Sequence, residues 1–145
     1  MVDGRIETTW WALRIALGAT AFLAGLDKFF NLLALWQMYL SPLAERMLPI
    51  SPAAFMHIVG VIEMAVGLII LLGWSRLGGY LAAAWLVAIA LNLVSTGVFY
   101  DLAVRDLVMA VAAFSLARIT EYREAVLGHQ TEDRSVPAGR AASRI

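Results

Sequence analysis

Residues 53–72 read AAFMHIVGVIEMAVGLIILL, an apolar run of twenty residues with a single acid, Glu63, near its middle. A helix of this length covers the hydrocarbon core of a bilayer, about 30 Å thick, at a rise of about 1.5 Å per residue. Lipid cannot satisfy exposed backbone amides, and the run lacks the alternation of a barrel strand. The stretch therefore predicts a membrane-spanning helix that carries an ionisable group near the midplane.

The rest of the chain repeats this pattern. Hydrophobic residues make up 61% of the 145 residues, more apolar surface than a soluble domain of this size can hide. We expect an all-α, polytopic membrane four-helix bundle within residues 1–128, followed by a polar, flexible tail at 129–145. The four predicted spans are 10–30, 53–72, 77–98 and 102–119. Recurrent small residues, including Gly18, Gly25, Gly60 and Gly67, favour close packing of these helices.

The connection between the first two spans, residues 31–52, is too apolar for a free loop and contains three prolines. A short interfacial helix fits it better. Four spans place both termini on one side, and most of the arginines lie on that side. The positive-inside rule therefore predicts cytoplasmic termini.

Composition excludes several kinds of chemistry. The chain has no cysteine, so thiol-disulfide exchange and iron–sulfur binding by this chain alone are excluded. It has two histidines and no recognisable metal-ligand spacing or phosphate loop, and we expect no metal site and no covalently bound cofactor. The charges balance at 11 basic and 11 acidic residues, so nucleic acid is not an expected partner. A redox role would have to borrow its electron carrier from a quinone or another subunit.

Glu63 is the main functional candidate, because a carboxylate at the midplane must be paired or protonated. Arg14 is its first candidate partner, although the two lie about 9 Å apart in depth and Arg14 can instead extend toward the interface. Two interpretations of Glu63 stay open. It is either a proton-exchanging or ligand-anchoring carboxylate, or a structural carboxylate that holds another helix.

A second set of polar residues lies at the outer end of the predicted bundle. It comprises Asp27, Lys28, His57, Asp101, Arg105 and Asp106. These residues form either a pocket for a quinone head group or small anion, or ordinary interfacial ion pairs in which Lys28 and Arg105 neutralise acids. His57 alone favours a capping or interfacial role. Asn92, in the outer half of the third span, favours hydrogen bonding between helices over contact with a ligand.

Three segments resemble the DoxX-like family of small four-span bacterial and archaeal membrane proteins. They are LRIALGATAFLAGLDKFF at 13–30, VIEMAVGLIILLGWSRLGGY at 61–80 and YDLAVRDLVMAVAAFSLARI at 100–119. The resemblance implies a four-helix bundle in a cytoplasmic membrane and an association with membrane redox enzymes, since the family takes its name from a subunit linked to quinol oxidation and thiosulfate:quinone oxidoreduction. Relatives that handle disulfides need cysteines, which this chain lacks.

These observations lead to one functional hypothesis and two alternatives. The chain is expected to be an integral membrane subunit of a larger quinone-linked redox or respiratory-type complex, in contact with lipid and other subunits, with quinone or lipid as its bound molecule. Glu63 would be its central acid, Arg14 and Arg105 its balancing bases, and Asp106 a second acid. The alternatives are a stand-alone quinone-dependent oxidoreductase acting on a small substrate such as a sulfur oxyanion, and a purely structural or assembly protein.

Overall fold

The computed structural model describes residues 2–135, and the secondary structure in this range is helical throughout. The four long helices are α1 (Gly4–Asp27), α3 (Pro52–Leu71), α4 (Ser75–Thr96) and α5 (Tyr100–Ser135). Two short helices, η1 (Trp36–Tyr39) and α2 (Pro42–Met47), occupy the connection between α1 and α3. The all-α class is confirmed, and a short helix does form where the apolar connection predicted one.

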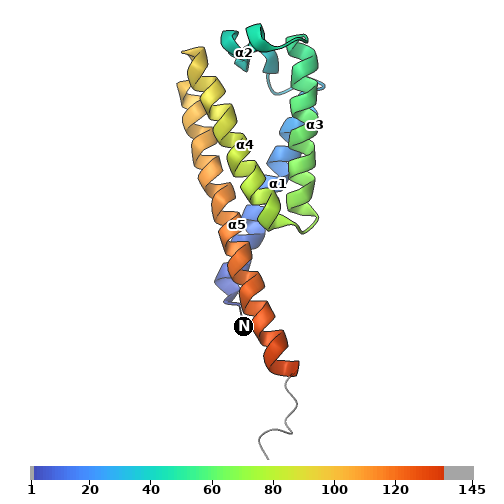
Figure 1. The fold of residues 1–145 in the computed structure, drawn as a ribbon, viewed down its shortest axis with the longest axis vertical. Coiled ribbons are helices and arrows are strands. Elements are labelled where there is room, and N and C mark those ends of the chain that lie inside the picture. Colours follow the sequence, from blue (N-terminus) through green and yellow to red (C-terminus); the bar gives the residue numbers. More distant parts are fainter. Residues whose placement is uncertain (1, 136–145) are drawn as a thin grey trace, which may run out of the picture.

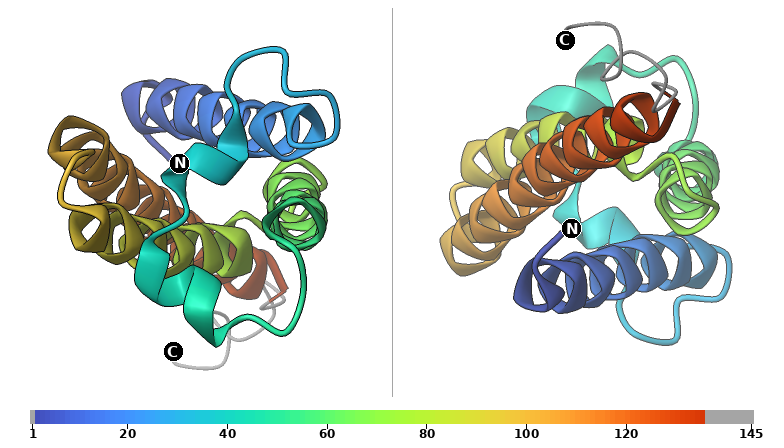
Figure 2. Two further views of the ribbon diagram at one scale, coloured as in Figure 1. Left: turned by 90° about the horizontal axis from the view of Figure 1, so that it is seen from above. Right: turned by 90° about the horizontal axis from the view of Figure 1, so that it is seen from below.

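The long helices alternate in direction along the chain (Figure 1). The N-terminus and the far end of α5 lie at one end of the molecule, while η1 and α2 cover the opposite end. We call these the terminal end and the capped end. The helices form two tight pairs, α1 with α3 and α4 with α5, and the contacts between the pairs are less extensive (Figure 2).

Three of the long helices meet the requirements of a membrane span. α1, α3 and α4 are each long and apolar enough to cross a bilayer, which is compatible with a multi-pass membrane protein. Large apolar side chains are exposed along all four long helices, among them Leu23, Ile58, Leu91 and Val108. Such a surface suits lipid better than water.

Helix ends differ from the predicted spans mainly where the chain turns polar. α1 begins at Gly4, where Asp3 accepts a hydrogen bond from the backbone N–H of Arg5. α5 continues to Ser135, well beyond residue 119 and into the predicted tail. Residues 129–135 are therefore helical, and the remaining tail residues, 136–145, lie outside the described part of the chain. The apolar runs mark only the part of each helix that suits lipid, whereas a helix continues into polar sequence while its backbone remains hydrogen-bonded.

The pairing of α1 with α3 depends on glycines that let the two backbones touch. A Cβ atom on Gly25 would lie 2.5 Å from the carbonyl oxygen of Gly60, and a Cβ on Gly67 would lie 2.7 Å from that of Gly18. Both distances are far below van der Waals contact, so only glycine fits these positions without separating the helices. Small residues allow the same close approach between membrane helices. In this structure the approach determines how the side chains are placed between α1 and α3.

Candidate functional site

The most unusual feature of the interior is an ion pair between α1 and α3. Lys28, directly after the last residue of α1, places its ammonium nitrogen 2.6 Å from Oε2 of Glu63 in the middle of α3. The two side chains are only 5% and 9% exposed. Gly60 makes this possible, because a Cβ there would lie 3.1 Å from the Cβ of Lys28. The missing side chain leaves room for the lysine stem to lie against α3.

Trp36 of η1 covers the ammonium group. The Lys28 nitrogen lies 3.7 Å from the centroid of the Trp36 ring, a cation–π distance. The indole N–H of Trp36 donates a 2.8 Å hydrogen bond to Oδ2 of Asp27, the residue next to Lys28. The lysine is thus enclosed by a carboxylate on one side and an indole face on the other.

Asp27 holds the turn that brings Trp36 into place. Its carboxylate also accepts hydrogen bonds from the backbone N–H groups of Leu32 and Leu33, and its side chain is buried. Asn31 adopts a positive φ of 52° within this turn. Asp27 is therefore a positioning residue. It ties the end of α1 to the connecting segment, residues 28–51, and orients the indole over Lys28.

The other helix pair completes the surroundings of the ion pair. The indole N–H of Trp85, on α4, lies 3.5 Å from Oε1 of Glu63, at the long limit of a hydrogen bond. Asp106, on α5, is half-buried and lies on the helix face that carries the buried Ala103 and Ala110. We call Lys28 and Glu63, with the two tryptophans Trp36 and Trp85, the interior cluster.

Arg14 does not pair with Glu63. Its guanidinium donates to the carbonyl oxygens of Ile70 and Leu71, at 3.1 and 2.5 Å, and lies against the rings of Trp10 and Trp11. Because α1 and α3 run in opposite directions, Arg14 lies level with the end of α3 and Lys28 lies level with its middle. The unpaired carbonyl groups of a helix C-terminus attract a cation, so Arg14 caps α3.

The other predicted site residues lie outside the interior cluster. His57 is exposed and stacks on Phe29 at 4.8 Å between ring centroids, and Arg105 is exposed on α5. Asn92 accepts a hydrogen bond from the backbone N–H of Ser41 and donates one to the carbonyl oxygen of Tyr39. It therefore bridges α4 to the connecting segment between α1 and α3. Of the six candidates, only Glu63 belongs to the interior cluster.

Sequence reasoning assigned Lys28 to the interface and missed Trp36 and Asp27 as its neighbours. A signal for the lysine was present in the spacing of the glycines. Lys28 follows Gly25 by three residues, as Glu63 follows Gly60, so a Gly25–Gly60 contact brings both side chains to one place. No comparable signal marked Trp36, which reaches the cluster only through the fold of the connecting segment.

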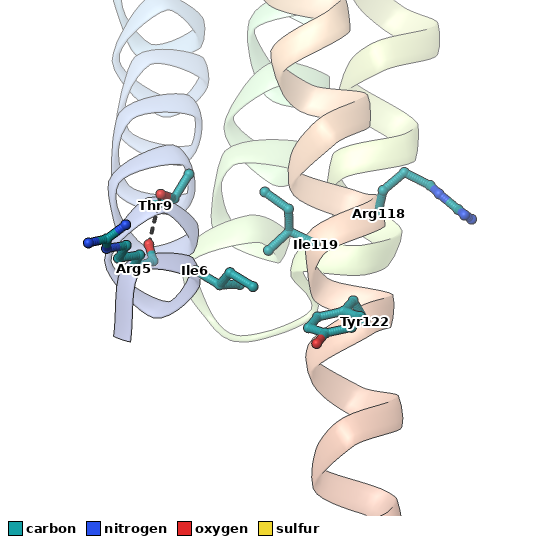
Figure 3. Close-up of a pocket in the computed structure, with 6 residues that line it drawn as sticks. All are labelled: Arg5, Ile6, Thr9, Arg118, Ile119 and Tyr122. Carbon is teal, nitrogen blue, oxygen red and sulfur yellow. Dashed lines mark hydrogen bonds between the residues drawn. The ribbon is translucent and has the colours of Figure 1, made fainter. Parts of the chain in front are cut away.

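A groove at the terminal end is separate from this cluster. It has a volume of about 440 Å³ and is lined by Arg5, Ile6, Thr9, Arg118, Ile119 and Tyr122. Figure 3 shows Ile6 of α1 and Ile119 of α5 directed into the space between the two helices, Tyr122 lying over α5, and the two arginine side chains directed away from that space. Arg5 and Lys28 are about 35 Å apart along α1. An open apolar groove offers no chemistry comparable to a buried ion pair.

Comparisons with known proteins add no further constraint. No family model matches the chain, and neither a curated protein nor a solved structure does. Within the described residues, no group of three His, Asp or Glu side chains is arranged to hold a metal ion.

Proposed function

We propose that the chain is a four-span integral membrane protein with cytoplasmic termini, and a subunit of a larger quinone-linked redox assembly. The observation that carries the proposal is the Lys28–Glu63 ion pair, closed at 2.6 Å inside apolar helices. Ionisable groups at such positions are costly and mark sites of proton, ion or ligand handling in membrane proteins.

The cost of the pair supports a functional role. Desolvating two charges offsets most of their attraction, and apolar residues of similar volume are usually as stabilising or more so. The surrounding groups are also those of a ligand-handling site, since they combine an ammonium donor, a carboxylate and two indoles in one place. A quinone head group needs such donors and acceptors, because its reduction to quinol consumes protons at the carbonyl oxygens.

The chain supplies surfaces for partners but no electron carrier of its own in its sequence. It lacks cysteine, so thiolate-bound clusters would have to belong to another subunit. The terminal end of α5 projects beyond the other helices (Figure 1) and carries charged residues on an exposed helix. This extension is suited to contact a soluble or membrane partner at the cytoplasmic surface.

The resemblance to the DoxX-like family supports the same proposal. Lys28 and Glu63 both belong to the segments that carry the resemblance, Lys28 directly after α1 and Glu63 within α3. The resemblance implies a cytoplasmic membrane of a bacterium or archaeon and a link to quinone chemistry. The coincidence of these motif residues with the interior cluster is the reason to place the function there.

The test is purification of the protein from its native membrane in mild detergent, with mass spectrometry of the bound proteins and quinones. The expected result is a defined set of partner subunits at stoichiometric yield, together with quinone-linked electron transfer. Glu63→Gln is expected to lower that activity while the partners remain bound, and Arg46→Ala, at an exposed position of α2, serves as control. A chain that purifies alone with bound quinone would favour a stand-alone oxidoreductase, and one that purifies alone without quinone would overturn the redox proposal.

A further inference from the structure

The segment between α1 and α3 covers the ion pair from the capped end, but few contacts hold it there (Figure 1). Neither η1 nor α2 contains a buried residue, and Leu32 and Leu33, which precede them, are 83% and 76% exposed. Helices of four and six residues are too short to be stable in isolation. The position of residues 32–48 therefore depends on the contacts made at the two ends of η1.

At the first end of η1, Trp36 closes over Lys28 and the chain turns at Asn31. Asn31 has a positive φ of 52°, and its side-chain oxygen is buried without a hydrogen-bond partner among the described residues. Buried polar atoms are nearly always hydrogen-bonded, so an unsatisfied oxygen opposes the arrangement that buries it. The hydrogen bond to Asp27 and the cation–π contact thus hold the indole in place against a cost at the turn.

At the second end of η1, Asn92 of α4 fastens the segment to the other helix pair. It accepts a hydrogen bond from the backbone N–H of Ser41 at 3.1 Å and donates one to the carbonyl oxygen of Tyr39 at 2.7 Å. The ring of Tyr39 also meets that of Phe99 edge to face, with 4.8 Å between the ring centroids. All of these contacts involve residues 39–41, so they are lost together when this short stretch moves away from α4.

We infer that residues 32–48 form a lid that opens toward the capped end and exposes the ammonium group of Lys28. The lid turns about residues 29–31 and is fastened by Asn92. In the closed state the indole of Trp36 lies 3.7 Å from the ammonium nitrogen. In the open state water or a small ligand takes the place of the indole, while the packing of α1 against α3 keeps the ion pair in register. The inference concerns access to the ion pair, so it goes beyond the proposed function and holds with or without a redox partner.

The sequence provides a direct probe of this movement, because Lys28 is its only lysine. An amine that is 4% exposed reacts with a water-soluble N-hydroxysuccinimide ester when the structure around it opens. The test labels the full-length chain in lipid nanodiscs at mildly alkaline pH and follows acylation of Lys28 by peptide mass spectrometry. Val66→Cys supplies the reference, since this position is buried within α3 and its thiol reports opening of the long helices themselves.

Lys28 is expected to react faster than the thiol at position 66, once each rate is divided by its value in the unfolded chain. Asn92→Ala should raise the rate at Lys28 about five- to thirty-fold, because the loss of one or two hydrogen bonds shifts an opening equilibrium by that factor. The thiol rate should stay unchanged. Ser95→Ala is the matched control, because the hydroxyl of Ser95 is exposed and donates within α4, and it should change neither rate.

A cross-link tests the closed state. Cysteines introduced by Tyr39→Cys and Phe99→Cys, at positions whose rings are in contact, can be joined by a cleavable bis-maleimide. The cross-link should protect Lys28 from acylation, and its cleavage should restore the reaction. Equal rates at Lys28 and position 66 would show that the lysine is exposed by unfolding of the helices, and labelling that ignores Asn92→Ala or the cross-link would show that residues 32–48 do not control access. Each of these results would overturn the inference.

Discussion

Replacing Lys28 by methionine tests the energetic role of the interior pair. Methionine keeps the unbranched shape of the lysine stem but removes the charge 2.6 Å from Glu63. Both side chains are more than nine-tenths buried, so water cannot replace the lost partner. Removing one member of a buried pair costs about 3–5 kcal/mol, because the remaining charge is left uncompensated.

The assay is unfolding by titration with sodium dodecyl sulfate in detergent micelles, followed by circular dichroism and tryptophan fluorescence. Arg105→Met is the matched control, because it removes a positive charge at an exposed position and should change stability by less than about 0.5 kcal/mol. The double variant Lys28→Met, Glu63→Leu should recover the loss and equal or exceed the original stability. Wild-type stability of Lys28→Met would refute this account of the pair.

Three further predictions concern the residues that build the site. Gly60→Ala should destabilise the protein by about 1–3 kcal/mol in the same unfolding assay, because its Cβ would lie 2.6 Å from the Gly25 carbonyl oxygen, and Gly128→Ala, with open space around it, should not. Trp36→Leu should cost about 1–2 kcal/mol through the lost cation–π contact, and Trp36→Phe should cost less; equal losses would contradict the role of the ring. Asn92→Ala should speed amide hydrogen exchange across residues 36–47 without changing α3, because its two hydrogen bonds hold that segment, and unchanged exchange would exclude this tether.

The positions of the long helices were predictable because apolar runs and helix signals coincide. α3 and α4 lie within two residues of the predicted spans. Ser51 and Pro52 start α3 as N-cap and first-turn proline, and Gly97 ends α4 with a φ of 76°. The polar ends of α1 and α5 were not predictable from hydropathy. Hydropathy reports which part of a helix suits lipid, and it does not report where the hydrogen-bonded helix ends.

The site was predictable only in part. Glu63 was found because one acid within twenty apolar residues needs compensation whatever the fold. Its partner depends on which helix adjoins α3 and at what register, and the length of a lysine stem permits several answers. Arg14 carries the charge that a partner of Glu63 needs, but the prediction that it pairs with Glu63 was wrong. The register of the two helices places Arg14 at the end of α3. Asp27 and Trp36 act through the turn at residues 28–36, whose path no periodicity describes.

The interior pair also has a consequence for how α1 and α3 find their register. Gly18 and Gly25 are seven residues apart, as are Gly60 and Gly67, and the structure places Gly25 against Gly60 and Gly18 against Gly67. A slide of seven residues, about 10.5 Å, would still bring one glycine against another.

Packing of glycines alone therefore discriminates weakly between the native and slipped registers. The slide would separate Lys28 from Glu63 and leave both charges unpaired in apolar surroundings, at a cost of several kcal/mol. A costly ion pair can thus specify one register even where it adds little net stability, as a polar residue does at a helical interface. The double variant Lys28→Met, Glu63→Leu should then be stable but heterogeneous in its helix register.

Spin labels can measure this heterogeneity. The chain lacks cysteine, so a cysteine introduced at each of the exposed positions Ile15 and Val61 can be labelled specifically. The distribution of distances between the two labels should gain a second population in the double variant. A single unchanged distance would show that the glycines alone fix the register.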